Sequence, residues 1–509
     1  MSATLSPPLP SVPSCPPTAP ERPARRQSGR RRLPTTAPWA VGCLLAAGWA
    51  FAFFLTSTQA PHRTWGLIAT AGYALAGLAA ALLPAARAPR APRAPRAPRA
   101  PRARAAVAVA VAVATLGAAV LPLAVLAARG EGQPEVLVVA RSADLLLETG
   151  SPYLPHPGEV NDYNPYLPAM ALFGLPAAVL GDPSADPSAG ALTGPLTGLL
   201  GDPRLWSGAF LLGCLAVSWR LLRSRPPGHA ARPSPPAPLT PLPLALGALA
   251  ASPLVAFPMA VSGIDLPLTG ACCLALALAG RGRAGWAGTV AGFACALKWT
   301  AWPLAPVAVV LLWRAHGPRA AVRCAAVLAA VAAVLTVPFA ITAPGPTVEQ
   351  VFRFPLGLAD LPTPAASPLP GHLLAELGGA GRAAALALLA AGAVAVAVRL
   401  LRRPPADAVG ACDVLAVGLT VAFLLAPASR FGYLALPIVL ALWPRLATGR
   451  RLPLPAPRLP APRLPAPRLP ALRLLPALRR LLLPAQPAAV RRSRPLTVPN
   501  RPVPSPRRK

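Results

Sequence analysis

Long apolar runs with few charges are the feature that most constrains how this chain can fold. A helix needs about 20 apolar residues to cross the hydrocarbon core of a bilayer, and runs near that length recur throughout the sequence. Charged residues make up 13% of the 509 residues, about half the usual share of a soluble domain. The sequence therefore predicts an all-α, polytopic bundle of about twelve transmembrane helices. The expected spans are about 38–57, 64–85, 105–128, 204–222, 239–261, 263–280, 284–300, 301–314, 320–342, 381–400, 407–426 and 429–446.

Segments rich in Pro and Arg divide the chain into regions. Residues 1–37 and 446–509 are expected to be disordered cytoplasmic tails, because their prolines exclude helix and they offer no apolar face to bury. Residues 88–102 consist of five Ala-Pro-Arg copies, which predict an extended, solvated linker. This linker closes a region with two extra spans, 38–104, and the main transmembrane domain is expected over 105–445.

Basic residues set the expected orientation. The 49 Lys and Arg residues against 16 Asp and Glu give a net charge of +33. They lie in the tails and in short loops rather than on one folded face, which argues against a nucleic-acid partner. Because cytoplasmic loops collect positive charge, both termini are expected inside. The outer loops are then 129–203 and 343–380, of which the first holds nine of the sixteen acids.

One apolar segment in the first outer loop is too irregular for a span. Residues 165–181 are short and contain three prolines. If they crossed the membrane, every later loop would change sides and the arginine pattern would invert. We therefore expect a re-entrant or membrane-surface element on the outer face.

Polar side chains at the outer ends of the spans are the candidate functional groups. Acidic residues on this side can take a proton from a hydroxyl group, and cations can hold a phosphate. The candidate catalytic acids are Glu135, Asp144 and Asp162, and the candidate donor-binding or acceptor-binding residues are Tyr153, Tyr163, Asn164, Asp265, Lys298, Arg353, Arg430 and Tyr433.

A simpler structural role stays open for most of the charged candidates. Carboxylates often cap helices or accept backbone N–H groups in turns, and long cationic side chains often reach to the membrane interface. These roles are a helix-end carboxylate for Glu135, a pair with Arg141 or a helix cap for Asp144, a turn for Asp162, an N-cap for Asp265, snorkelling beside Trp299 and Trp302 for Lys298, and a headgroup anchor for Arg430.

The main transmembrane domain resembles glycosyltransferase family 87, a group of polytopic transferases of the GT-C superfamily. That family has an Asp after a transmembrane helix, Gly-x-x-Tyr roughly fifteen residues later, then Tyr-Pro-Pro-Leu opening an apolar run, and a later Lys-x-x-Pro span. The resemblance covers about residues 105–445. The corresponding positions here are Glu135, Gly150, Tyr153, the segment Tyr163-Asn-Pro-Tyr-Leu-Pro and, in Ala-Leu-Lys-Trp-Thr-Ala-Trp-Pro, Lys298.

The resemblance implies a GT-C-like bundle that transfers a hexose, with mannose expected, and inverts the anomeric centre. The donor would be a polyprenyl-phosphate sugar, and the acceptor a lipid or cell-envelope glycan at the outer face of a bacterial plasma membrane. Glu135, helped by Asp144 or Asp162, would act as the base, and Lys298, Arg353 or Arg430 would lie near the phosphate. Two departures are Glu in place of Asp, which lengthens the arm by one methylene, and the insertion at 182–203.

Cations are expected to suffice for the leaving phosphate, so no metal or other cofactor is expected. The absence of a Gly-rich phosphate loop favours a lipid donor over a nucleotide donor. Besides donor and acceptor, the expected partners are membrane lipids. A transporter or flippase of envelope lipids is the alternative, but it predicts inverted repeats and a charge near mid-membrane, whereas the acids here lie at span ends. A structural membrane protein without catalysis is a third interpretation.

Overall fold

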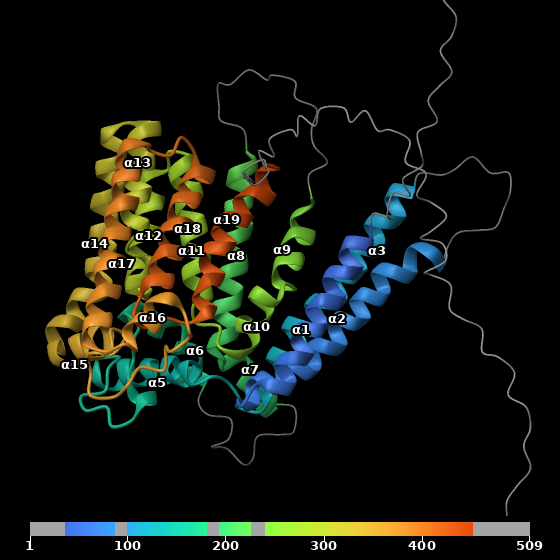
Figure 1. The fold of residues 1–509 in the computed structure, drawn as a ribbon, viewed down its shortest axis with the longest axis horizontal. Helices are drawn as coiled ribbons and strands as arrows, with labels where there is room; N and C mark the ends of the chain where they lie inside the picture. The colour runs from blue at the N-terminus through green and yellow to red at the C-terminus, as the bar shows by residue number, and fades with distance from the viewer. Residues whose placement is uncertain (1–35, 87–98, 181–192, 225–239, 451–509) are drawn as a thin grey trace, which may run out of the picture. The chain divides into compact units, whose positions relative to one another are not determined.

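Apolar helices form the framework of the protein. A computed structural model describes residues 36–86, 99–180, 193–224 and 240–450. Regular structure within these ranges is helical, apart from one isolated bridge between Ala366 and Ser429 (Figure 1). The predicted all-α class is confirmed. The predicted tails fall almost wholly outside the described residues, as does most of the Ala-Pro-Arg linker.

Eight helical segments in the described residues are long and apolar enough to cross a membrane. A ninth results if α9 (Leu242–Ala250) and α10 (Pro253–Val261), which are bent by 66°, form one broken span. The bend falls where Pro253 starts α10, since proline cannot continue the preceding helix. The eight are α1 (Ala37–Thr56), α2 (Ala60–Ala86), α3 (Arg99–Thr115) continued by η1 (Leu116–Val120) and α4 (Leu121–Ala128), α8 (Pro203–Arg223), α14 (Pro318–Thr342), α17 (Gly379–Arg402), α18 (Ala408–Leu425), and η6 (Phe431–Leu434) with α19 (Ala435–Thr448).

About twelve spans are therefore not confirmed. The three remaining apolar segments form α11 (Leu266–Gly280), α12 (Ala284–Leu297) and α13 (Leu304–His316). Even the longest, α11 with 15 residues, rises only about 22 Å, against a hydrocarbon core of about 30 Å. Nearly all of α11 is buried among protein neighbours, so it does not have to match the thickness of the lipid.

One prediction about the linker is wrong at its end. Helix α3 already begins at Arg99 and includes Pro101, within the last Ala-Pro-Arg copies. Proline is tolerated in the first turn of a helix, because the N–H groups there have no partner within the helix.

Short elements of the two predicted outer loops gather at one end of the bundle, the lower end in Figure 1. In the described part of the predicted re-entrant segment, residues 165–180, the regular structure is η3 and α6, and neither is among the candidate spans, in agreement with the prediction that this segment does not cross. We call this the site end. Its elements are α5 (Pro134–Thr149), η2 (Val160–Asp162), η3 (Pro168–Phe173), α6 (Leu175–Leu180), α7 (Thr193–Gly201), η4 (Trp299–Ala301), α15 (Pro344–Val348), η5 (Glu349–Arg353) and α16 (Pro370–Ala375).

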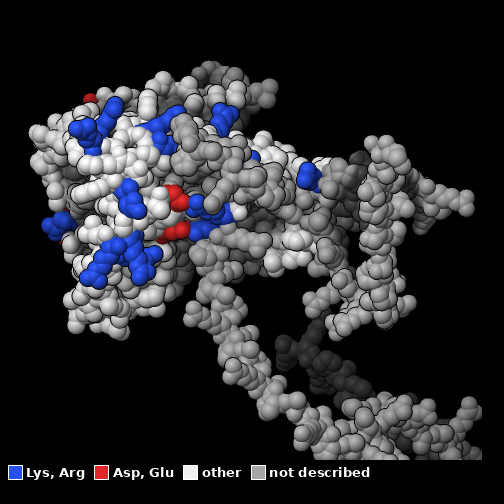
Figure 2. Space-filling view, turned by 90° about the horizontal axis from the view of Figure 1, so that it is seen from above, with Lys and Arg blue, Asp and Glu red and all other residues white. Residues whose placement is uncertain are grey.

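Arginine-bearing loops meet at the opposite end, which we call the arginine end. Arg281 after α11 donates from Nη1 to the Ser224 carbonyl at the end of α8, at 2.9 Å. Arg450 after α19 pairs with Asp407 before α18, at 2.5 Å. Figure 2 shows this face from above, with blue Lys and Arg groups spread over it and few red ones. The folded chain thus separates the predicted cytoplasmic loops from the predicted outer loops.

Glycines let α12 approach α14 closely. A Cβ on Gly288 would lie 2.6 Å from the carbonyl oxygen of Cys324, and one on Gly292 would lie 2.6 Å from that of Leu328. Small residues of this kind are the usual means of close packing between membrane helices. The contact anchors α12 against α14, and Lys298 follows the last residue of α12.

Candidate functional site

An ion pair joins two predicted site residues that are 295 positions apart in the sequence. Glu135 lies in the first turn of α5, where the helix N-terminus favours a negative charge. Arg430 directly precedes η6 and donates from Nη1 to Glu135 Oε1. The two side chains are only 18% and 30% exposed, respectively. Arg430 is therefore tied to the protein rather than extended to a lipid headgroup.

The second carboxylate oxygen of Glu135 is free. Its Oε2 atom is buried and has no hydrogen-bond partner among the described residues. Leaving a charged oxygen buried without a partner is costly, so such atoms call for an explanation. Arg430 holds one oxygen of this carboxylate and leaves the other able to accept a proton or a hydrogen bond.

A second ion pair lies close by. Lys298 follows the last residue of α12 and donates to Asp265 Oδ1 at 2.8 Å. The Lys298 side chain is 9% exposed, so it does not reach outward to the interface. Asp265 occupies the N-cap position of α11, but its side chain makes no cap hydrogen bond and binds Lys298 instead. Burial opposes the charge on Lys298, but the charge and hydrogen bond of Asp265 outweigh it and raise its pKa, so Lys298 stays protonated.

Two tyrosine rings connect the pairs into one cluster. The Lys298 ammonium lies 4.6 Å from the ring centroid of Tyr433 and 5.4 Å from that of Tyr166, within cation–π range. Burial raises the pKa of Tyr166, and the charges of Glu135 and Asp265 raise it further. Both acids therefore act on the same ring. We call these six residues the ionic cluster: Glu135, Tyr166, Asp265, Lys298, Arg430 and Tyr433.

Tyr153 and Asn164 hold the loop that carries Tyr166. The Tyr153 hydroxyl donates to the Tyr166 carbonyl at 3.0 Å. Asn164 donates from Nδ2 to the Pro152 carbonyl at 3.0 Å, and its Oδ1 accepts the Tyr166 N–H at 3.1 Å. Both side chains are buried, and their hydrogen bonds go to backbone groups. Their observed role is thus to position Tyr166.

The two outer loops are held together by Tyr163 and by two residues that the sequence analysis did not single out, Gln350 and Phe354. Gln350 is fully buried, accepts the Asn164 N–H at 3.0 Å and donates to the Leu154 carbonyl at 2.6 Å. Tyr163 stacks on Phe354 with ring centroids 4.3 Å apart. No local pattern marks Gln350, because its partners lie almost 200 residues away. Tyr166 belongs to the segment Tyr163-Asn-Pro-Tyr-Leu-Pro, and its place in that motif could have marked it as a site residue.

Asp162 lies in a turn rather than in the ionic cluster. Its carboxylate accepts the Gly158 and Glu159 N–H groups at 3.1 and 3.0 Å and pairs with Arg141 at 3.0 Å. The backbone N–H of Glu159, the one from Gly158 and the Arg141 charge together lower the pKa of Asp162. These contacts match the turn role that the sequence left open.

Asp144 and Arg353 also lie apart from the ionic cluster in the contacts of the described residues. Asp144 is exposed on α5, and at 100° per residue its nine-residue separation places it on the face opposite Glu135. Arg353 is largely exposed, pairs with Glu349 at 3.0 Å and donates to the Leu358 carbonyl at 3.1 Å.

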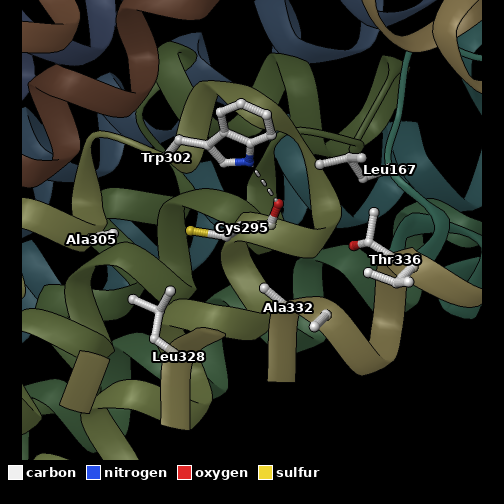
Figure 3. Close-up of a pocket in the computed structure, with 9 residues that line it drawn as sticks. Leu167, Cys295, Trp302, Ala305, Leu328, Ala332 and Thr336 are labelled. Atoms are coloured by element: carbon white, nitrogen blue, oxygen red, sulfur yellow. Dashed lines mark hydrogen bonds between the residues drawn. The ribbon is translucent and has the colours of Figure 1, made fainter. Parts of the chain in front are cut away.

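An apolar groove starts beside the ionic cluster. It has a volume of about 290 Å³ and lies between α14, the end of α12 and the start of α13 (Figure 3). Leu167 links it to the cluster, because this residue follows Tyr166 and donates its N–H to the Leu297 carbonyl at 3.0 Å, next to Lys298. The lining residues are Leu167, Cys295, Trp302, Ala305, Leu328, Ala332, Ala333, Thr336 and Val337.

Side chains of both charges meet in the ionic cluster. In the described ranges, no three or more His, Cys, Asp or Glu side chains are grouped so that they could hold a metal ion. The cluster combines two cations with two carboxylates, and one of these, Glu135, has a buried oxygen without a partner among the described residues. Such a set can hold a phosphate and accept a proton at neighbouring points.

Comparison with known proteins identifies the family. The model for "Glycosyltransferase family 87" matches residues 166–427, more than half of the chain. That stretch includes Tyr166, Asp265 and Lys298, whereas Glu135 and Arg430 lie outside it. No curated protein and no solved structure matches the chain. Together with its apolar helices, the match shows that the chain belongs to glycosyltransferase family 87 and is a membrane glycosyltransferase.

Proposed function

We propose that the protein transfers a hexose, with mannose the expected sugar, from a polyprenyl-phosphate donor to a lipid or cell-envelope acceptor, with inversion. The proposed place is the outer face of a bacterial plasma membrane, at the site end. The carrying observation is the Glu135 carboxylate, buried with Oε2 unpartnered and Oε1 held by Arg430. A buried, free carboxylate oxygen suits the general base that deprotonates an acceptor hydroxyl.

The donor is proposed to lie with its lipid in the groove and its phosphate at the two cations. The groove lining is almost entirely apolar, which suits an isoprenoid chain. Leu167 lines the groove and directly follows Tyr166 in the sequence. The Lys298 ammonium lies 5.4 Å from the centroid of the Tyr166 ring. Lys298 and Arg430 would hold the phosphate oxygens by charge-assisted hydrogen bonds.

Proton transfer and departure of the phosphate would be coupled through Arg430. The acceptor oxygen attacks the anomeric carbon, the bond from that carbon to the phosphate oxygen breaks, and the hydroxyl proton passes to Glu135 Oε2. Glu135 then becomes neutral and no longer competes for Arg430. The guanidinium is free to stabilise the leaving polyprenyl phosphate just as its negative charge increases.

A donor panel tests this proposal. The purified protein, reconstituted with envelope lipids as acceptors, is offered radiolabelled polyprenyl-phosphate hexoses and nucleotide hexoses, and the anomeric configuration of the product is determined. We expect transfer from a polyprenyl-phosphate hexose only, with the configuration inverted. Transfer from a nucleotide sugar alone, or retention of configuration, would overturn the proposal.

A further inference from the structure

A second cavity lies at the arginine end, on the far side of the bundle from Glu135. It has a volume of about 650 Å³ and lies between the first turns of α12 and α14. Its polar lining consists mainly of arginines. Glycines, which have no side chain to fill the cavity, and the indole ring of Trp286 complete the wall. The residues that matter here are Gly282, Arg283, Gly285, Trp286, Arg319 and Arg323.

The three arginines of this cavity are unpaired. Neither a carboxylate nor a hydrogen-bond acceptor in the described residues contacts Arg283, Arg319 or Arg323. Other arginines at the same end do have partners, such as Arg445 with Asp413 and Arg450 with Asp407. What distinguishes Arg283, Arg319 and Arg323 is that all three line one cavity.

The chain has little acid left with which to neutralise this cavity. Outside the described ranges the sequence contains three carboxylates, Glu21, Asp182 and Asp186. Three converging guanidinium groups repel one another unless an anion lies among them. The side chains of Arg283, Arg319 and Arg323 are exposed, and an anion bound among them would relieve this repulsion.

The ends of two helices add to the positive potential. Helix α12 starts at Ala284 and α14 at Pro318, and in neither case does a side chain cap the helix. The uncapped N-terminus of a helix carries partial positive charge and favours phosphate groups. Arg323 packs over the first turn of α12, since a Cβ on Gly285 would lie 3.5 Å from its guanidinium nitrogens.

The surroundings of the cavity suit a lipid. Few residues of α14 are fully buried, so the face of this candidate span that turns away from α12 is open to the bilayer. Trp286 is 67% exposed and Val322, one residue before Arg323, is exposed as well. Tryptophan is enriched where hydrocarbon meets headgroups, and basic pockets between membrane helices bind anionic headgroups.

We propose that the cavity at Arg283, Arg319 and Arg323 binds the phosphate headgroup of an anionic membrane lipid, apart from the donor site. The lipid phosphate lies between the guanidinium groups, and its chains run along α14. This assignment does not depend on the proposed reaction, because it concerns the opposite end of the bundle.

Lipid binding by a charge-matched pair of variants tests the assignment. The protein with Arg319→Gln and Arg323→Gln is compared with the protein carrying Arg402→Gln and Arg403→Gln, two exposed arginines at the end of α17. Native mass spectrometry measures the binding of phosphatidylglycerol, phosphatidylcholine and inorganic phosphate. At about 1 kcal/mol for each arginine near an anionic surface, the cavity variant should bind phosphatidylglycerol at least about tenfold more weakly.

The control variant should bind phosphatidylglycerol within about threefold of the unsubstituted protein, which should itself prefer this lipid to phosphatidylcholine. Equal losses in both variants would overturn the assignment in favour of general surface attraction, and so would equal binding of the two lipids. Inorganic phosphate that bound as tightly as phosphatidylglycerol would overturn the assignment to a lipid.

A second measurement reports on the place of binding without altering an arginine. Brominated phosphatidylglycerol should quench tryptophan fluorescence, and Trp286→Phe should remove the saturable part of that quenching. Saturable quenching that persisted in Trp286→Phe would place the lipid elsewhere and overturn the assignment.

Discussion

Replacing Glu135 by glutamine separates its role as a base from its role as an ion-pair partner. The amide oxygen introduced by Glu135→Gln can still accept the hydrogen bond from Arg430, so the shape of the site and this contact persist. The basic oxygen at Oε2 is lost. A general base contributes about 10²–10⁴-fold in rate, or about 2.7–5.4 kcal/mol, so transfer should fall at least ~100-fold.

The same substitution has a smaller cost in stability. Breaking a fully buried ion pair costs about 3–5 kcal/mol, but these side chains are 18% and 30% exposed and the hydrogen bond remains. A cost of about 1 kcal/mol is expected instead. Thermal unfolding of the variant is measured first, and rates are then compared well below its midpoint, so that loss of fold is not mistaken for loss of chemistry.

The assay is single-turnover transfer from a radiolabelled polyprenyl-phosphate hexose, with two companion variants. Glu135→Asp should retain part of the activity, because the resembled family has the shorter acid at this position. Asp144→Asn, on the opposite face of α5, should stay within about threefold of the unsubstituted protein. Transfer by Glu135→Gln at the unsubstituted rate would refute the base and leave Glu135 as a helix-end carboxylate.

Three further predictions concern other parts of the structure. Lys298→Met keeps the apolar stem but removes the ammonium, so the donor KM should rise more than about tenfold in steady-state assays. The control Arg353→Met should change the donor KM less than about threefold. Equal effects of the two substitutions would disprove the proposed phosphate site. Gly292→Val forces a side chain against the Leu328 carbonyl and should cost about 1–3 kcal/mol, seen as a lower unfolding midpoint, whereas Gly213→Val, with open space around it, should not. Because folding lowers the pKa of Asp162, its carboxylate stabilises the fold above the unfolded value of 3.8, and this contribution is lost as the pH falls through the folded value. The difference in unfolding midpoint between the unsubstituted protein and Asp162→Asn should therefore shrink towards low pH, and a constant difference down to pH 2 would contradict this reasoning.

The limits of the sequence are clearest in the number of spans. Hydropathy identified every long helix, but it also counted α11, α12 and α13 as spans. Burial in protein is enough to explain an apolar sequence such as that of α11. Burial in protein and exposure to lipid select the same residue types. Composition alone therefore could not distinguish a full span from a short buried helix.

The site shows the same division. Its acidic and basic residues could be picked out beforehand because polar groups at span ends are costly and few. Whether each of them has a structural or a functional role could be decided only from the packing. Asp162 lies in a turn, whereas the side chains of Lys298 and Arg430 point inward to carboxylates. Proline and carboxylate spacing predicts the turn locally, but nothing local predicts an inward-facing cation.

By itself the sequence determined an all-helical membrane protein, the separation of arginine loops from acidic loops, and the family, since all three depend on residue types along the chain. Only the tertiary structure decided that Glu135 meets Arg430 across 295 residues and that Tyr166 and Tyr433 enclose Lys298. It also brought Arg283, which precedes α12, and two arginines of α14, Arg319 and Arg323, around one cavity. The physical reason is that apolar burial acts on each segment separately, whereas ion pairs form only after helix packing has brought distant segments within a few ångströms.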